Sequence, residues 1–466
     1  MTKFKRNLVL LNACISTFMA TVDGSIVNIT LPVISSYFSV NINQVQWIVT
    51  SYLLAISALL LIWGRISDLY GRKYLFAAGM AIFTTGSLLC GLSNTFNALV
   101  ISRVFQALGA SIMMALAQGI VTSIFPSNER GKAMGFIGMV VAIGSLVGPS
   151  LGGVLVHSFG WQSIFFVNIP FGVLGLALTF LVMPNNQVLP KIKIFDFKGT
   201  MIFVVSILLL FISLLAMQQG SISAMTMWGM LLIAFILITI FIKYERKQKY
   251  PLVNMGLFKN RVFSIGLLSA YLSFCAMFAY VFFMPFFLQY ALGINILHAG
   301  ILMSLYPITM ALVAPLSGWL SDKITYKPLT LLGLSINTVT MIFMSNLNTY
   351  SSKLHIGILI VLLGMGSSIF QSPNNSSVMG AVPRDKLGTA GSINAFFRNF
   401  GMVSGTTISV IIFTLVTKLG IDSISSNAFE VAVFLRGFKV VFLSAALFYL
   451  IAVFISLKRN RVFDRK

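Results

Sequence analysis

Apolar runs of about 20 residues or more recur along the whole chain and leave little sequence between them. A helix needs about 20 residues to cross a hydrocarbon core about 30 Å thick, so each run can span a membrane. The runs predict fourteen spans, at residues 8–31, 44–63, 74–93, 96–117, 133–156, 161–183, 198–217, 224–243, 262–290, 298–320, 327–345, 355–379, 388–416 and 436–457. Hydrophobic residues make up 58% of the chain and charged residues 9%, which excludes a soluble globular protein. We therefore expect an all-α polytopic membrane protein with 14 transmembrane helices.

Lysine and arginine are distributed unevenly among the loops that join these runs. The two termini are basic, and so is every second loop, beginning with residues 65–73. Most of the loops between them carry little charge. Because Lys and Arg accumulate on the cytoplasmic side of membrane proteins, we expect both termini in the cytoplasm. The net charge of +22 is then an orientation signal, and no nucleic-acid partner is expected. The expected location is a bacterial cytoplasmic membrane, crossed many times.

The chain offers few residues for covalent or metal chemistry. Its 3 cysteines all fall within predicted spans: Cys14, Cys90 and Cys275. This placement indicates neither a disulfide framework nor a metal site, and we expect no cofactor. Its 3 histidines lie far apart in the sequence and form no His-Glu-x-x-His motif: His157, His298 and His355. A polytopic membrane enzyme or sensor is therefore a remote alternative.

One ten-residue pattern occurs twice. The segments GRISDLYGRK, at 64–73, and GWLSDKITYK, at 318–327, both read Gly-x-x-Ser-Asp-x-x-x-x-Lys. Each follows a span of the same direction, which favours duplication of one half of the protein over coincidence. The predicted organisation is a six-helix bundle at 1–186, two inserted helices at 187–250 and a second six-helix bundle at 251–466.

Three charged side chains lie well inside predicted spans: Asp23, Arg103 and Arg398. Such residues are costly in lipid, so we expect them to face a bundle interior and to have partners. At a rise of about 1.5 Å per residue, Asp23 and Arg103 both lie roughly 10–12 Å below the same membrane surface, which permits an ion pair. Arg398 has no evident acidic partner in its half of the chain, and a structural role and a substrate contact are equally open.

The pairing of Asp23 with Arg103 has two interpretations. The pair can simply fasten two helices together. Alternatively, the carboxylate holds Arg103, a proton or a cationic substrate in turn, because burial disfavours the ionised form and a nearby arginine favours it. Helix movement would then change the proton affinity of Asp23, which makes the pair a candidate proton-coupling site. Gly24 leaves room beside the carboxylate, and Asn28, one turn away, can bond a ligand or another helix.

Small residues gather in the fifth predicted span around a proline. The glycines are Gly144, Gly148, Gly152 and Gly153, and the proline is Pro149. Glycines spaced four residues apart let helices approach closely, and a proline inside a helix removes one backbone hydrogen bond. The run predicts a close contact with another helix and a bend.

These segments together resemble the major facilitator superfamily, and in particular its 14-helix drug:proton antiporter branch. GRISDLYGRK resembles the superfamily's loop motif and supplies its residues Gly64, Asp68, Gly71, Arg72 and Lys73. LVISRVFQALGA is similar to the fourth-helix motif, and GSLVGPSLGGVL to the fifth-helix motif of antiporters. TVDGSIVNITLP resembles the first-helix signature, with Val and Ser in place of the usual Leu and Thr. MPFFLQYALG and VPRDKLGTAGSINAFFRNFG are also similar to this branch.

The resemblance implies two bundles that rock about a central cavity, which opens to each side of the membrane in turn. It implies that the loop motif latches one of these states, with Asp322 as the counterpart in the second half, where GWLSDKITYK lacks the second Gly and the Arg. Five residues become candidate substrate contacts: Asp23, Asn28, Gln106, Gln289 and Arg398.

The energy source is constrained by the residues themselves. No Gly-x-x-x-x-Gly-Lys-Ser/Thr loop occurs, because Gly131-Lys132 is followed by Ala133, and ATP is therefore not the fuel. We expect a monomeric, proton-coupled multidrug exporter, whose partners are protons, membrane lipids and lipophilic monocationic, zwitterionic or neutral compounds. Dications are expected to be poor substrates, since Asp23 is the one clear acid inside a span. Export of a lipid-like or siderophore-like metabolite is the alternative.

Overall fold

The structure, a computed structural model, describes residues 2–40, 42–45, 47–184, 194–219, 223–418 and 428–459. Helices account for almost all of this part of the chain, and no strand occurs in it. Fourteen of its helical segments are long and apolar enough to cross a membrane, which confirms the predicted number. The predicted all-α polytopic fold is therefore confirmed.

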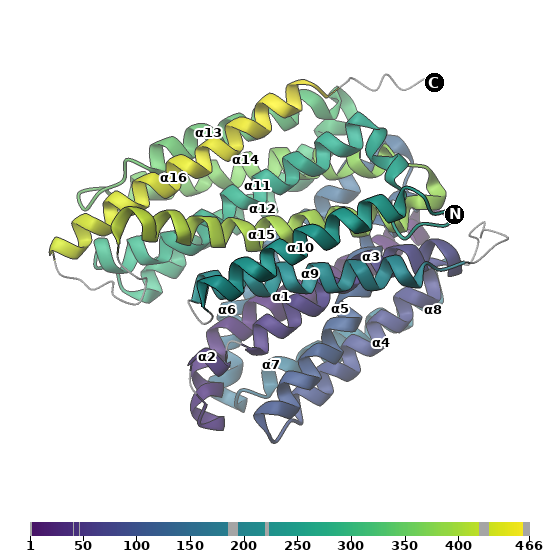
Figure 1. The fold of residues 1–466 in the computed structure, drawn as a ribbon, viewed down its shortest axis with the longest axis horizontal. Coiled ribbons are helices and arrows are strands. Elements are labelled where there is room, and N and C mark those ends of the chain that lie inside the picture. The colour runs from purple at the N-terminus through teal and green to yellow at the C-terminus, as the bar shows by residue number, and fades with distance from the viewer. Residues whose placement is uncertain are drawn as a thin grey trace.

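The first half of the chain forms one set of mutually packed helices (Figure 1). Its helices are α1 (Lys3–Phe38), α2 (Ile42–Val45), α3 (Trp47–Tyr70), α4 (Arg72–Gly91), α5 (Phe96–Ile124), η1 (Ser127–Glu129), α6 (Arg130–Phe159), α7 (Ser163–Phe166) and α8 (Asn168–Val182). Helix α5 packs on α3 and α4, and α1 packs on α6. The long helices are apolar on several faces, as expected where one face meets lipid and another meets neighbouring helices.

The second half forms a corresponding set. Its helices are η2 (Met255–Lys259), α11 (Arg261–Phe286), the π-helix η3 (Phe287–Ala291), α12 (Ile296–Ile324), α13 (Tyr326–Met344), α14 (Lys353–Gly380), η4 (Arg384–Lys386), α15 (Leu387–Thr417) and α16 (Ala428–Leu457). Local sequence sets several helix starts. Asn260 and Asn295, for example, accept hydrogen bonds from backbone N–H groups in the first turns of α11 and α12.

Helices α9 (Phe197–Gln219) and α10 (Ala224–Glu245) join the two sets and pack on each other. Helix α9 also contacts α3 and α15, so the pair lies along one boundary between the halves (Figure 1). The contact is partly aromatic, since the Phe203 and Phe396 rings lie 5.7 Å apart. Of the predicted domain boundaries, residue 186 lies outside the described residues, and residue 250 lies between α10 and α11.

Helix α1 begins and α16 ends at the same end of the molecule (Figure 1). We call it the basic end, because the loops there are rich in Lys and Arg: residues 65–73, 127–132, 246–261, 323–327 and 383–386. Several bounds differ from expectation; for example, α3 ends at Tyr70 and not at 63, and the predicted span 161–183 is divided into α7 and α8. Helix α1 extends beyond the predicted 8–31 in both directions, and the predicted span 262–290 changes to a π-helix two residues after Pro285, which has no backbone N–H.

Candidate functional site

Asp23 lies at the centre of a polar network inside the first bundle. Arg103 Nη1 donates to Asp23 Oδ2 at 2.7 Å. Gln106 Nε2 and Asn168 Nδ2 donate to Asp23 Oδ1 at 2.9 and 3.2 Å. Asp23 is 0% exposed and Arg103 is 1% exposed. Helices α1, α5 and α8 therefore meet at one buried carboxylate.

Arg103 has further partners in the same network. Its Nε donates to the Ile48 carbonyl at 3.2 Å and its Nη1 to Gln106 Oε1 at 2.6 Å. The guanidinium also lies 4.0 Å from the centre of the Tyr52 ring, within range of a cation–π contact. Burial of an ion pair is costly unless its remaining hydrogen-bonding groups are satisfied, and these contacts from α3 and α5 offset that cost.

The three donors from Arg103, Gln106 and Asn168 enclose the carboxylate on both of its oxygens. The same burial restricts substrate contact, because no face of Asp23 is open in this conformation. There is open space one residue further on, where a Cβ built on Gly24 would meet no atom within 4 Å. The side chain of Asn28 lies outside the described residues.

The glycine-rich run of α6 packs against α1 beside this network. A Cβ on Gly144 would lie 3.0 Å from Thr21, and one on Gly148 would overlap the Ser25 hydroxyl. Ser25 Oγ in turn donates to the Gly144 carbonyl at 3.1 Å. The predicted close helix contact is therefore present. Gly152 is buried and Gly153 is exposed, while the side chain of Pro149 lies outside the described residues.

Asp68, at the end of α3, joins the two bundles at the basic end. It accepts hydrogen bonds from the Gly388 N–H at 2.9 Å, the Thr389 N–H at 2.8 Å and the Thr389 hydroxyl at 2.7 Å. These groups form the first turn of α15, where backbone N–H groups lack helical partners and the helix dipole favours an anion. Arg72 adds a contact to Asp68 at 3.4 Å and another to the Arg384 carbonyl at 3.1 Å. Lys73 instead bonds the Phe180 carbonyl within the first bundle.

Asp322 makes the corresponding contact from the second bundle. It accepts hydrogen bonds from the N–H groups of Gly131 at 2.8 Å and Lys132 at 2.9 Å, in the first turn of α6. The two copies of the sequence pattern therefore place their aspartates against a helix start of the opposite bundle. Gly71 has φ +96°, and its counterpart Thr325 has φ +74° with ψ 159°, so the second copy keeps the turn without the glycine.

Glycines allow the bundles to touch near these aspartates. A Cβ on Gly64 would lie 2.7 Å from the Gly388 carbonyl oxygen, and one on Gly318 would lie 2.7 Å from the Gly131 carbonyl carbon. Further along, a Cβ on Gly391 would lie 2.8 Å from the Ala115 carbonyl oxygen. All of these contacts between bundles lie toward the basic end, which is closed in this conformation.

Arg398 and Gln289 lie apart from the Asp23 network. Both side chains are partly exposed, Arg398 within α15 and Gln289 within the π-helix η3. Near Arg398, Asn394 Nδ2 donates to Gln118 Oε1 of α5 at 2.8 Å and to Asn375 Oδ1 of α14 at 3.1 Å. These amides link the two bundles. Of the four predicted substrate contacts whose side chains are described, Asp23 and Gln106 share one network, and Gln289 and Arg398 lie outside it.

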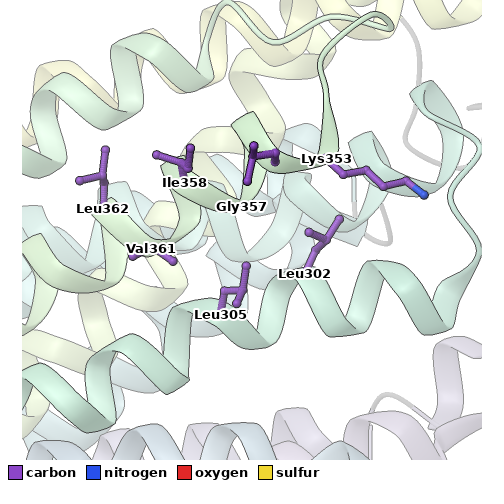
Figure 2. A pocket seen from close by; sticks show the side chains of 8 residues that line it. Leu302, Leu305, Lys353, Gly357, Ile358, Val361 and Leu362 are labelled. Carbon is purple, nitrogen blue, oxygen red and sulfur yellow. The ribbon is translucent and has the colours of Figure 1, made fainter.

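An apolar groove of about 510 Å³ lies between α12 and α14 (Figure 2). Figure 2 shows Leu302 and Leu305 of α12 facing Gly357, Ile358 and Val361 of α14, with Lys353 at the start of α14. No predicted site residue lines it, and leucine-rich surfaces of this kind suit lipid chains. We therefore do not place the substrate there.

Several functional candidates were missed by sequence reasoning. Asn168 is an amide near the start of an apolar helix, a weak signal that does not reveal its partner. Asn375 and Asn394 are amides within predicted spans, and Gln118 directly follows the predicted span 96–117. Amides are uncommon in lipid, so this feature was available in the sequence.

Two helical bundles that touch at one end, with buried polar groups inside the membrane-spanning part, have the architecture of an alternating-access membrane transporter. A family model described as Major Facilitator Superfamily matches residues 13–406. The chain therefore belongs to the major facilitator superfamily, and the protein is a multi-pass membrane transporter and not an enzyme.

Two relatives with assigned functions are similar to most of the chain. The riboflavin transporter RibZ of Clostridioides difficile (strain 630) is 38% identical over 86% of this chain and 86% of its own length. The multidrug transporter protein MdtP of Bacillus subtilis (strain 168) is 30% identical over 87% of this chain and 74% of its own length. Among solved structures, the proton:xylose symporter XylE aligns with a TM-score of 0.68 at 14% identity, covering 98% of this chain and 96% of XylE. That likeness concerns the fold alone.

Proposed function

We propose that the protein exports lipophilic compounds in exchange for protons, by alternating exposure of a site between its bundles. The observation that carries the proposal is the buried Asp23 carboxylate, held by donors from α5 and α8 that a helix movement can withdraw. Proton binding would replace the Arg103 contact during part of the cycle. The multidrug transporter among the relatives supports drug-like substrates.

The test is proton movement in proteoliposomes during efflux of a fluorescent dye. Wild type is expected to exchange protons for dye, and Asp23→Asn, which keeps the side-chain size but cannot ionise, is expected to lose the exchange. Glu129→Gln is the matched control, because Glu129 is a partly exposed acid at the basic end. If proton exchange persists in Asp23→Asn, the Asp23–Arg103 pair only holds two helices together. Asp68 would then be the next candidate for the proton site.

A second candidate function is transport of riboflavin or a related planar heterocycle. The relative at 38% identity, a riboflavin transporter, supports this second candidate. Riboflavin movement across proteoliposomes, followed by its fluorescence, tests this directly. Movement at the rate of protein-free liposomes would remove the candidate without affecting drug export.

We also propose that the protein is a monomer in a bacterial cytoplasmic membrane with both termini in the cytoplasm. The concentration of Lys and Arg at the basic end supports this orientation. The described conformation, closed at that end, would then face outward. The test is a reporter that is active only in the cytoplasm, fused to either end of the chain. If neither fusion is active, both termini lie outside the cytoplasm and the proposed orientation is wrong.

A further inference from the structure

Arg398 carries a charge that the structure leaves uncompensated. Among the described residues, no ion pair, hydrogen bond or ring contact involves its guanidinium. It lies eleven residues after the start of α15 at Leu387, which corresponds to a depth of about 16 Å at the usual helical rise. That depth is close to the middle of a hydrocarbon core about 30 Å thick. An unpaired charge at the midplane is costly, and it is expected to serve a ligand or an ion pathway.

Arg398 faces the boundary between the bundles. On α15, Gly391 packs against Ala115 of α5, and Asn394 bonds Gln118 of α5. Arg398 follows Asn394 by four residues, about one helical turn, and therefore continues the same face of α15 away from the basic end. The close contacts between bundles lie nearer the basic end, so Arg398 lies just beyond the point where the bundles touch.

A second pair of polar residues lies beside it on α14. Asn375 bonds Asn394, which sets the register between these antiparallel helices. Gln371 precedes Asn375 by four residues, and because α14 runs toward the basic end, Gln371 lies at the level of Arg398. Both Gln371 and Arg398 are partly exposed. Two adjacent polar layers result. The layer nearer the basic end is closed by amide hydrogen bonds, and the layer of Gln371 and Arg398 is left open.

The charge around this layer opposes a cationic ligand. Asp23, the acid expected to attract cations, is 0% exposed and already accepts hydrogen bonds on both oxygens. A guanidinium offers only donors, arranged to match carboxylate, phosphate or paired carbonyl oxygens, and an amide adds one donor group and one acceptor.

We propose that Gln371, Asn375, Asn394 and Arg398 form the binding site for the polar head of the substrate, and that this site selects acceptor-rich neutral or anionic compounds over cations. The inference rests on the proposed export function and refines its substrate class. It also excludes the monocations that were among the substrates expected from the sequence. Breaking the Asn394–Gln118 bond when the bundles rock would also change the site, which links binding to the transport cycle.

The test uses three planar fluorescent probes with the purified full-length protein in detergent: riboflavin, which is neutral and carries imide carbonyls, flavin mononucleotide, which is anionic, and ethidium, which is cationic. Wild type is expected to bind both flavins about tenfold more tightly than ethidium. Arg398→Gln is expected to weaken flavin mononucleotide binding about tenfold, to weaken riboflavin binding less, and to strengthen ethidium binding. Arg398→Lys, which keeps the charge, should retain most of the flavin mononucleotide affinity.

Arg436→Gln is the matched control, because Arg436 is an exposed arginine of α16 and its loss should leave all three affinities unchanged. Stronger ethidium binding by Arg398→Gln cannot arise from misfolding. Tighter binding of ethidium than of the flavins by wild type, no binding of any probe, or an unchanged flavin mononucleotide affinity in Arg398→Gln would each overturn the assignment. Loss of proton exchange with these affinities intact would instead count against proton coupling alone.

Discussion

The individual residues with the largest electrostatic cost are Asp23 and Arg103. Sequence reasoning placed them at matching depth, and the structure joins them at 2.7 Å. Their roles in proton coupling remain predictions. Asn168 and the Ile48 carbonyl complete the network, but a single sequence does not show which helices surround a buried charge. The depth of a residue along its helix can be calculated from its position in the sequence, whereas its neighbours on other helices cannot.

Thr325 is a residue whose backbone conformation makes a specific prediction. Its φ of +74° with ψ 159° is a region that only glycine occupies without strain, and the strain costs about 1–3 kcal/mol in a branched residue. Thr325→Gly is therefore expected to raise the midpoint of thermal unfolding in detergent. Thr325→Ala retains a Cβ and should gain much less. A midpoint in Thr325→Gly at or below that of wild type would show that the turn is not strained.

At the scale of helices, two aspartates hold the starts of two helices. Asp68 of α3 caps α15, and Asp322 of α12 caps α6, so each bundle supplies one carboxylate and one helix N-terminus. The duplicated pattern predicted that these residues correspond. It did not predict that each would bind a helix of the other bundle, because the contact depends on how the bundles pack.

Neutralising either aspartate should loosen the basic end. Asparagine keeps an acceptor oxygen but loses the charge, and charged hydrogen bonds contribute about 1.5–3 kcal/mol, so Asp68→Asn and Asp322→Asn should each favour opening by about tenfold or more. The measurement is maleimide labelling of Ser372→Cys, a buried position facing Gly138 of α6, in a variant without its native cysteines. Glu129→Gln, which removes an acid at the same end, should label at the parent rate. Equal labelling in all three variants would remove the latch role from both aspartates.

At the scale of the whole molecule, the bundles touch toward one end and are joined along one side by α9 and α10. The hydrophobic core largely follows this division. Apart from Ala142 of α6, one cluster of buried residues lies in the second bundle, and apart from Ala395 of α15 another lies in the first. A shared cluster includes Phe203 of α9, Val121 of α5 and Ile393 of α15. Transport by rocking requires the shared contacts to separate, while those within each bundle persist.

A disulfide across the closed end should therefore stop transport. A Cβ on Gly138 of α6 lies 3.4 Å from the Ala314 Cβ of α12, close to the separation of about 3.5–4.5 Å found in disulfides. Gly138→Cys with Ala314→Cys, in a chain without Cys14, Cys90 and Cys275, should lose at least about nine-tenths of its transport on oxidation and recover on reduction. Each single variant is the control. Full transport by the oxidised double variant would show that these helices do not separate during the cycle.

The amino-acid sequence by itself determined the membrane class, the number of spans, the repeated ten-residue pattern and the charges that cannot face lipid. These follow from local quantities, namely hydropathy, spacing and the cost of burying charge. Only the tertiary structure decided that Asp23 is enclosed within one bundle, that Asp68 and Asp322 bind opposite helix starts, and that Arg398 has no partner among the described residues. The reason is that these properties depend on distances between helices far apart in the chain, which the apolar pattern of each helix leaves unspecified.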